Sequence, residues 1–402
     1  MGLRFRLAID YYIGSLLHVF LKPLNLLLGK LLSRDHDLRK CSSVTIIKML
    51  GGGSLVIAYP ALLAIKNAPN VRSLRLLTTP GVRPFAECLG IFDEIIVIRD
   101  QSLLGLGLDS MRALRILFRC DAIVDLEIHS RLTTVFAVFA CARNRIGFYT
   151  GNSFWRKGLS THLLFCNIST GIYHFYDQIA EMFGGTVPDL GAAKSLFRAS
   201  LGPVGAVPDD NLRLALSPCC SDLSKERMLR HDEWLAILER RLGRDGTSRK
   251  FEIHLFGAPR DRPSLEELAA LIRDKFSNPS IFNHAGETSL RESVQILSTV
   301  HEQLCIDSAL LHFGRLLGIK TVSYWGPTSP ASLLRPWRNG QDEVHYVQLP
   351  CSPCVHLAQE APCRGNNICM RLAVNPNLPH DANPAWMIAD DRVTRFARPG
   401  GP

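Results

Sequence analysis

The sequence has little of three features that would place it in a familiar class at once. Lys22, Pro23 and Lys30 interrupt its most apolar stretch, residues 11–32, whereas a membrane-spanning helix needs about 20 apolar residues in succession. Cysteine accounts for 12 of 402 residues, well below the density of a disulfide-stapled module. No P-loop and no G-x-G-x-x-G motif occurs. We therefore expect neither a polytopic membrane protein nor a disulfide-rich domain.

The composition is that of a globular protein with locally concentrated positive charge. Hydrophobic residues make up 47% of the chain, and 46 basic residues against 37 acidic ones give a net charge of +9. Residues 1–40 hold seven basic and three acidic residues, so 7 − 3 = +4 of that charge lies in a tenth of the chain. A chain of this length favours two domains. No nucleic-acid-binding motif accompanies the charge, so we expect no nucleic-acid partner.

The first 40 residues combine apolar and basic side chains in one segment. Leu, Ile, Phe and Tyr flanked by Lys and Arg suit an interfacial helix on an anionic membrane. The alternative is a helix packed on the protein body or on a second subunit. Pro23 should kink or divide the helix in either case.

The remaining chain alternates apolar strands with helices, which predicts parallel sheets covered on both faces. We expect two Rossmann-like domains facing a cleft, of residues 41–202 and 211–402, joined by a Gly/Pro-rich linker at 203–210. The predicted strands are 44–50, 74–79, 94–99, 122–128, 213–218, 251–257, 281–285, 303–307 and 320–326, and the predicted helices are 55–67, 109–119, 231–242, 264–275, 289–299 and 309–317.

Two segments have the pattern of anion-binding turns. Gly51, Gly52 and Gly53 follow a strand and precede a helix, so their backbone N–H groups can approach a phosphate; a plain tight turn is the alternative. Asp307 and Ser308 end a strand and open a helix, and His312 shares that helix face. A diphosphate could sit there, although a simple N-cap and a buried core histidine explain the same residues.

Three stretches together resemble glycosyltransferase family 9, the lipopolysaccharide heptosyltransferase family. They are IIKMLGGGSLVIAYPAL near the start, RNRIGF at 143–148 and DSALLHFGRLLGIKTVSYWGPTSP in the second half. The resemblance covers residues 44–370 and implies a GT-B fold, with the acceptor bound mainly by the first domain and a nucleotide-sugar by the second. It also implies an inverting transfer that requires no metal or other cofactor.

The resemblance also assigns donor-binding residues. The donor-diphosphate motif falls on Asp307, Ser308, Ala309 and His312, with Ala309 standing where the family usually has Gly. A basic residue that contacts the donor phosphates falls on Arg227, with Lys225 beside it, and both could instead be ordinary solvated charges. The remaining expected donor contacts are Asp261, near the family's ribose-binding carboxylate, and Gly326 and Thr328 of the Gly-Pro-Thr-Ser-Pro turn.

The catalytic base departs from the family pattern. The family's glycine loop carries an Asp, whereas Ser54 stands at that position here, and a serine hydroxyl does not act as a base at its ordinary pKa. Inverting transfer needs a base within hydrogen-bond reach of the attacking hydroxyl. Asp125, Glu127 and His129, at the end of the predicted strand 122–128, are the candidates. They could equally cap the following helix. Two further alternatives are that the chain belongs to a branch with a different acceptor or a relocated base, or that it has lost catalysis.

Four of the cysteines form a separate cluster. Cys351, Cys354, Cys363 and Cys369 lie within residues 351–369 as C-x2-C-x8-C-x5-C, while the other eight are scattered and suit buried thiols in a reducing compartment. Four thiolates so spaced can hold zinc or an iron–sulfur group in a structural role. Reduced thiols that shape a loop, or disulfides, are the alternatives.

The sequence thus predicts a metal-independent, inverting glycosyltransferase at the inner face of the cytoplasmic membrane. It would move a sugar from a nucleotide-sugar such as ADP-heptose to a lipid-linked glycan such as lipopolysaccharide core. The alternative, motivated by Ser54, is a non-catalytic nucleotide-sugar-binding or glycan-assembly protein on the same fold.

Overall fold

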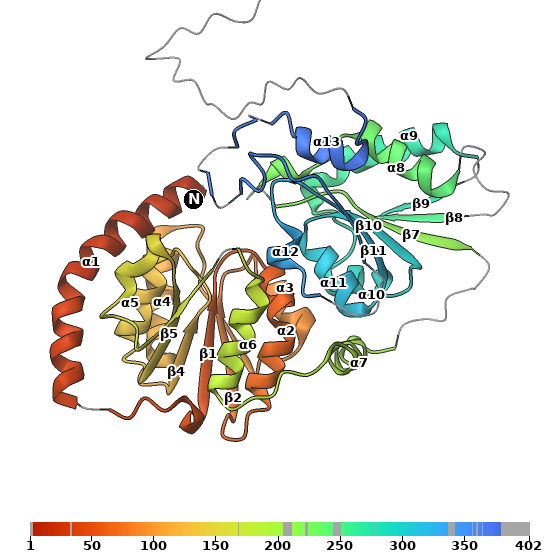
Figure 1. Cartoon of the computed structure of the whole chain (residues 1–402). Coiled ribbons are helices and arrows are strands. Elements are labelled where there is room, and N and C mark those ends of the chain that lie inside the picture. The colour runs from red at the N-terminus through yellow and green to blue at the C-terminus, as the bar shows by residue number, and fades with distance from the viewer. Residues whose placement is uncertain are drawn as a thin grey trace, which may run out of the picture. The chain divides into compact units, whose positions relative to one another are not determined.

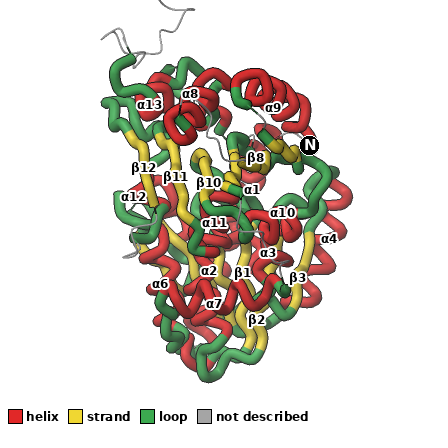
Figure 2. Tube along the Cα trace, turned by 90° about the vertical axis from the view of Figure 1, so that its right-hand side faces the viewer, coloured by secondary structure: helices red, strands yellow, loops and turns green. Residues whose placement is uncertain are grey.

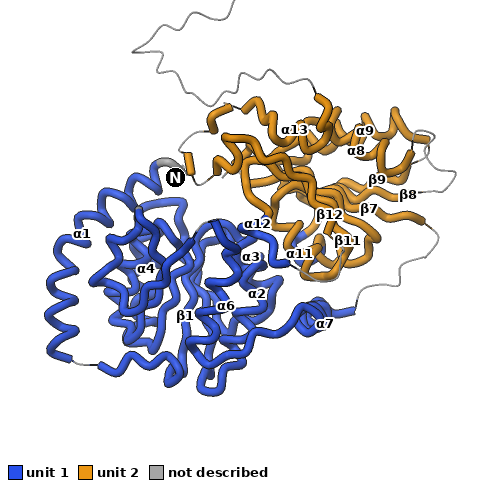
Figure 3. The backbone as a smooth tube through the Cα atoms, viewed as in Figure 1, with its two compact units in different colours: residues 1–204, 289–292, 331–338 blue, residues 205–288, 293–330, 339–402 orange. Residues whose placement is uncertain are grey.

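A computed structural model describes most of the chain. The described residues are 3–32, 34–167, 169–203, 211–221, 224–243, 251–277, 279–336, 342–355, 357–358, 361–363 and 365–378. They form two compact units: unit 1 is residues 1–204, 289–292 and 331–338, and unit 2 is residues 205–288, 293–330 and 339–402 (Figure 3). Residues 204–210 of the predicted linker lie outside the described residues.

Unit 1 is a six-stranded parallel sheet with helices on both faces (Figure 1). Its strand order is β3-β2-β1-β4-β5-β6, the order of a Rossmann fold. The strands are β1 (Ser43–Lys48), β2 (Ser73–Thr78), β3 (Glu94–Val97), β4 (Ala122–Asp125), β5 (Asn144–Tyr149) and β6 (His162–Phe165). The helices are α1 (Leu3–Leu32), α2 (Gly53–Lys66), α3 (Arg83–Leu89), α4 (Leu103–Leu117), α5 (Arg131–Phe139), α6 (Ile172–Met182) and α7 (Leu190–Leu201).

Unit 2 repeats this topology with its own six parallel strands (Figure 2). The order β12-β11-β10-β7-β8-β9 again reverses beside the first strand of the unit. The strands are β7 (Leu212–Ser217), β8 (Phe251–Leu255), β9 (Ser280–Asn283), β10 (Glu302–Ile306), β11 (Lys320–Trp325) and β12 (Asp342–Tyr346). The helices in this half of the sequence are α8 (His231–Leu242), α9 (Arg262–Lys275), α10 (Leu290–Leu297), α11 (Ala309–Leu317), α12 (Pro330–Leu333) and α13 (Ile368–Val374).

Near-continuous apolar strands explain both cores. Every residue of β4 and of β10 is buried, as expected for parallel strands with helices on both faces. In unit 2, the buried rings of Trp234 and Tyr324 meet edge to face, 6.2 Å apart. The predicted Rossmann-like α/β class of both halves is therefore confirmed.

Helix α1 continues through Pro23 without dividing, so of the two predicted effects of this proline the division is not found. One predicted strand boundary is wrong. Strand β4 ends at Asp125 rather than at residue 128, because the Asp125 carboxylate accepts the backbone N–H of Glu127 and turns the chain out of the ladder. Glu127 and His129 therefore do not share a strand face, as the predicted strand had required.

Candidate functional site

In each unit, several candidate residues follow the two strands between which the strand order reverses. In unit 1 the reversal falls between β1 and β4, and in unit 2 between β7 and β10. Ligands of such sheets bind beyond the carboxyl ends of the strands at this point. The loop 49–52 and residues 126–130 follow β1 and β4, while residues 218–224 and Asp307 follow β7 and β10. Sequence-based reasoning thus selected residues at the two sheet edges where ligands of such folds bind.

The glycine loop of unit 1 has a backbone that only glycine accommodates. Gly51 has φ of 71°, in the left-handed region that other residues rarely adopt. A Cβ on Gly52 would lie 2.2 Å from Cδ2 of Phe85. Gly53 opens helix α2. The predicted glycine loop is therefore present, and it packs tightly against the Phe85 ring.

We expect Gly52→Ala to destabilise unit 1 by about 1–3 kcal/mol, the usual cost of overpacking. The new methyl would collide with the Phe85 ring, so the double variant Gly52→Ala/Phe85→Leu should recover part of the loss. Urea unfolding monitored by circular dichroism measures both. Equal stability of Gly52→Ala and the parent protein would show that the ring moves aside freely.

Glu127 holds the glycine loop in place. One carboxylate oxygen accepts the backbone N–H groups of Met49 (2.7 Å) and Leu50 (3.0 Å). The Lys48 ammonium lies 3.2 Å from the same oxygen and is itself largely buried. This carboxylate is therefore bound to the loop backbone. The sequence pattern did not indicate that Lys48 is its partner.

Asp125 is enclosed and paired with a buried arginine. Its Oδ2 lies 3.2 Å from a guanidinium nitrogen of Arg156, whose side chain is fully buried, and accepts the Thr133 hydroxyl at 2.8 Å. Burial raises the Asp125 pKa, although Arg156 and these hydrogen bonds oppose the rise. The site favours a structural role for Asp125 over proton abstraction. Arg156 was missed because a lone arginine in a polar stretch carries no sign of burial.

His129 and Ser54 differ in how freely they can react. The Ser54 hydroxyl lies close to Tyr176, near the N-terminus of α2. His129 is accessible to solvent, and partial desolvation followed by the charge of Arg156 lowers its pKa below 6.5. Its imidazole is therefore mostly neutral at pH 7 and can accept a proton.

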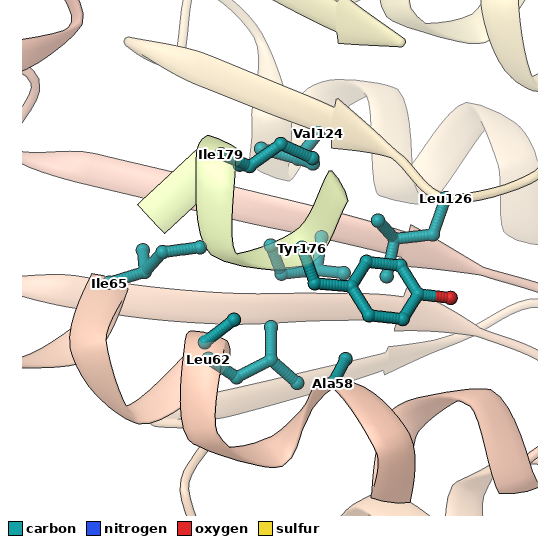
Figure 4. A pocket seen from close by; sticks show the side chains of 9 residues that line it. Ala58, Leu62, Ile65, Val124, Leu126, Tyr176 and Ile179 are labelled. Carbon is teal, nitrogen blue, oxygen red and sulfur yellow. The ribbon is translucent and has the colours of Figure 1, made fainter. Parts of the chain in front are cut away.

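Tyr176 also borders a small hollow in unit 1. Figure 4 shows its ring beside Leu62 and Ala58 of α2 and Leu126 after β4. The lining is almost wholly apolar, so this hollow belongs to the core packing and offers no polar group for a phosphate or a sugar hydroxyl. The remaining lining residues are Ile46, Ala61, Ile65, Val124 and Ile179.

In unit 2, Asp307 lies between the side chains of Arg227 and His312. One guanidinium nitrogen of Arg227 donates to the Asp307 carbonyl at 2.8 Å and lies 3.3 Å from its carboxylate. The imidazole of His312 lies 3.7 Å from the other carboxylate oxygen. Burial alone would raise the Asp307 pKa, but His312 and Arg227 hold it below its ordinary value. The structure thus brings together three residues spread over 86 sequence positions (312 − 227 + 1).

The predicted cap at the start of α11 is partly wrong. Ser308 occupies the N-cap position, but its side chain makes no capping hydrogen bond, and the Asp307 carboxylate faces Arg227 and His312 instead. Among the described residues the Ser308 hydroxyl has no hydrogen-bond partner, and Thr328 lies beside Asp307. Ala309 is the first residue of the helix. The helix N-terminus therefore keeps its N–H groups available for an anion.

Lys225 and Asp261 are less closely tied to this centre. Lys225 is exposed in the short 3-10 turn Lys225–Arg227. The Asp261 carboxylate accepts the backbone N–H of Ala258 at 2.8 Å, so it holds the loop that follows β8. Contact of either residue with a donor stays a prediction.

The cysteine segment packs against the turn that follows β11. A Cβ on Gly326 would lie 2.6 Å from Sγ of Cys369, the Ser352 hydroxyl donates to the Gly326 carbonyl, and the Cys354 N–H donates to the Pro327 carbonyl at 3.0 Å. All twelve cysteines are free thiols, which argues against the disulfide alternative. The segment therefore braces the Gly326 turn.

The thiols of Cys351, Cys354, Cys363 and Cys369 are close enough to influence one another electrostatically. Within the described part of the chain, however, no three His, Cys, Asp or Glu side chains are grouped so as to hold a metal ion. The donor atoms suit zinc or an iron–sulfur group, but their arrangement does not. A structural metal there stays a prediction, which metal analysis of the purified protein tests.

The sequence of unit 2 matches a known family. Residues 211–364 match the model of glycosyltransferase family 9 (heptosyltransferase). The predicted resemblance to this family is therefore confirmed for that part of the chain. The matched region contains Arg227, Asp307 and His312, whereas the glycine loop of unit 1 lies outside it.

Curated relatives of the family match over short stretches. Lipooligosaccharide heptosyltransferase 2 of Campylobacter jejuni serotype O:6 is 27% identical over 109 residues, which is 27% of this chain and 34% of that protein. The enzyme of the same name from Haemophilus influenzae is 29% identical over 80 residues, 20% of this chain and 23% of its own. The similarity thus spans about a third or less of each relative.

Solved family 9 structures share the fold over most of the chain. E. coli ADP-heptose LPS heptosyltransferase II superposes with a TM-score of 0.56 at 17% identity, covering 76% of this chain and 91% of its own. A family 9 glycosyltransferase from Veillonella parvula gives a TM-score of 0.58 at 16% identity, covering 77% and 87%. These likenesses confirm the GT-B fold class predicted from the sequence.

Proposed function

We propose that this protein transfers a sugar, heptose by preference, from a nucleotide-sugar to a lipid-linked glycan such as lipopolysaccharide core. The observation that carries the proposal is the grouping of Arg227 and His312 around the buried Asp307, at the N-terminus of α11. A guanidinium, an imidazole and the N–H groups of a helix N-terminus in one place suit a diphosphate. A solved E. coli relative of the same fold is described with ADP, which makes ADP-heptose the first donor to test.

The transfer step needs positive charge at the leaving group. An acceptor hydroxyl oxygen attacks the anomeric carbon, the bond from that carbon to the diphosphate oxygen breaks, and both electrons leave with the nucleoside diphosphate. Arg227, His312 and the α11 amides stabilise the charge that develops there. Because these groups can supply that charge, we propose that the reaction needs no metal ion. A single displacement of this kind inverts the anomeric configuration.

His129 is the base that we propose for the acceptor hydroxyl. The carboxylates of Glu127 and Asp125 are engaged with the loop backbone and with Arg156. His129 is accessible, and its lowered pKa keeps the imidazole in the proton-accepting form. The proton lost by the hydroxyl goes to an imidazole nitrogen.

A transfer assay tests the proposal. Purified full-length protein is incubated with ADP-heptose and lipid acceptor extracted from cells lacking the chain, with and without EDTA. We expect a product whose new glycosidic bond has the anomeric configuration opposite to that of the donor, formed at the same rate with EDTA. Retention of configuration would exclude single displacement, and EDTA inhibition would exclude the metal-free step. Donor binding without turnover on any acceptor would favour the non-catalytic alternative that Ser54 suggests.

We further propose that α1 places the protein on the cytoplasmic face of the membrane. Unlike a soluble surface helix, this helix exposes most of its large apolar side chains. It packs on the rest of unit 1 through the polar side chains of Arg6, Asp10, His18 and Asn25 and through Leu17 and Leu21, which join Val135 and Leu159. The exposed large apolar side chains are Phe5, Leu7, Tyr11, Tyr12, Ile13, Leu16, Val19, Phe20, Leu24, Leu26, Leu27, Leu28, Leu31 and Leu32.

An apolar surface of this size on a helix of 30 residues marks a lipid contact. By length and composition α1 is also able to cross a membrane. However, its polar side is bound to unit 1 from the Arg6–Asp100 ion pair to the hydrogen bond of Asn25 with the Gly158 carbonyl. We therefore propose that α1 lies along the bilayer surface, with Lys22 and Lys30 near anionic headgroups.

The packing of α1 should weaken in acid because of His18. This side chain is buried against the Trp155 ring, and desolvation lowers its pKa to about 4. The unfolded chain, with a histidine pKa of about 6.5, then binds more protons than the folded one between pH 6.5 and 4, so stability is lost as the pH falls through this range. We expect a loss of up to about 2 kcal/mol from this group between pH 7 and 5.

Urea unfolding of the parent and of His18→Gln at pH 7 and pH 5 measures this contribution. The variant should show a smaller loss on acidification. The pKa of His254 in unit 2 is also lowered to about 4, so His254→Gln serves as the matched comparison whose effect is confined to unit 2. An unchanged pH dependence in His18→Gln would contradict the assignment.

A further inference from the structure

We infer that Asp10 of α1 is a positioning residue for the glycine loop. Helix α1 would then help to position the loop at which the acceptor is proposed to bind. The physical coupling is a property of unit 1 alone, whereas its consequence for transfer rests on the proposed function. The coupling consists of three consecutive sets of contacts, from α1 to α5, from α5 to Arg156, and from Arg156 to the loop.

The first contacts join α1 to the start of α5. The Asp10 carboxylate accepts the backbone N–H groups of Arg131 and Leu132, each at 2.9 Å, and the Ser130 hydroxyl at 2.6 Å. Asp10 therefore caps α5 from another helix, 120 residues away in sequence. A carboxylate at this end of a helix is favoured both by the free N–H groups and by the helix dipole. Gly14 permits the approach, because a Cβ there would lie 2.4 Å from that of Arg131.

The second contacts join the start of α5 to Arg156. The Ser130 carbonyl accepts a guanidinium N–H of Arg156 at 3.1 Å. Ser130 therefore contacts Asp10 through its hydroxyl and Arg156 through its carbonyl. The same guanidinium nitrogen donates to the Glu127 carbonyl and lies 3.2 Å from the Asp125 carboxylate. The Arg156 side chain is completely buried and has no water to replace a lost acceptor.

The third contacts join this centre to the loop. The Asp125 carboxylate accepts the Glu127 N–H at 3.0 Å, and Arg156 binds the Glu127 carbonyl, so both backbone groups of Glu127 are fixed. The Glu127 side chain in turn holds the N–H groups of Met49 and Leu50. Moving the α5 start would therefore release the anchor of the loop that precedes Gly51, Gly52 and Gly53.

Asp10 is well suited to a direct test because it lies outside the loop that it is inferred to hold. Amide hydrogen exchange followed by mass spectrometry compares the full-length parent with Asp10→Asn. We expect exchange about fivefold faster at residues 130–134, from the weakened cap, and faster exchange also at residues 48–53. The matched control is Asp100→Asn, which breaks the Arg6–Asp100 ion pair one helical turn before Asp10 and should leave residues 48–53 unchanged.

Two results would overturn the inference: faster exchange confined to residues 130–134, or equal acceleration at 48–53 in both variants, which would show general loosening of α1. If Asp10→Asn fails to fold, Ser130→Ala removes one bond to Asp10 and provides the same comparison. In transfer assays, Asp10→Asn should raise KM for the lipid acceptor while KM for the donor stays unchanged. The exchange result stands even if no transfer is found, so the failure of the coupling and of the proposed function are distinguishable.

Discussion

Replacing Arg227 by alanine should lower the transfer rate by about 10²–10³-fold, the usual effect of removing one group that stabilises a developing negative charge. The guanidinium is held by the Asp307 carbonyl and carboxylate and is largely buried, at 14% side-chain exposure. A neighbouring side chain therefore cannot easily take over the position of this guanidinium. Steady-state kinetics at saturating acceptor, with the donor varied, measures the loss.

Arg230→Ala is the matched control for this experiment. Arg230 lies three residues further on, is 61% exposed and pairs with Asp232, so its removal should change the transfer rate less than twofold. Arg227→Lys should recover only part of the activity, because an ammonium cannot reproduce the forked contact of a guanidinium. Parent-like turnover by Arg227→Ala would remove the structural basis for the proposed diphosphate site.

Replacing Arg156 by methionine should destabilise unit 1 by about 3–5 kcal/mol, the usual cost of removing one partner from a buried ion pair. The guanidinium has no solvent exposure, and the Asp125 carboxylate that it leaves behind is only 5% exposed. The Glu127 and Ser130 carbonyls also lose their donor. Urea unfolding at pH 7 measures the change.

The double variant Arg156→Met/Asp125→Asn should recover part of this loss, because the stranded charge is then removed as well. Arg143→Met is the surface control: its guanidinium is 40% exposed and lies 3.9 Å from Asp121, so we expect a change below about 1 kcal/mol. A small effect of Arg156→Met, similar to that of Arg143→Met, would contradict the structural role of the Arg156–Asp125 pair.

The sequence predicted unit 2 more completely than unit 1 for a physical reason. Its strands are short apolar runs bounded by polar turns, and the predicted helices 231–242 and 309–317 coincide with α8 (His231–Leu242) and α11 (Ala309–Leu317). The grouping of Asp307 with His312 followed from helix periodicity. The contact of Arg227 with Asp307 did not, since only the family resemblance pointed to Arg227.

The contacts that hold the candidate site of unit 1 together could not be predicted from the sequence. Asp10, Lys48 and Arg156 are charged residues whose partners lie far away in the chain. Strand β5 was not predicted because Arg145 and Gly147 interrupt its apolar pattern, and Gly147 is needed to admit the Arg156 guanidinium. For α1, composition indicated lipid, but only the structure shows that its polar side faces the protein.

Donor binding tests the central claim most directly, because it requires neither the acceptor nor the base. Thermal unfolding of the purified protein is followed with ADP-heptose, with UDP- and GDP-sugars, and with no ligand, for the parent and for Arg227→Ala. A ligand at 100 times its Kd adds about 2.7 kcal/mol of stability. We predict that ADP-heptose stabilises the parent, that the other sugars do not, and that Arg227→Ala loses the effect. Stabilisation by UDP- or GDP-sugars alone would contradict the heptose donor, and an undiminished shift in Arg227→Ala would contradict the diphosphate site itself.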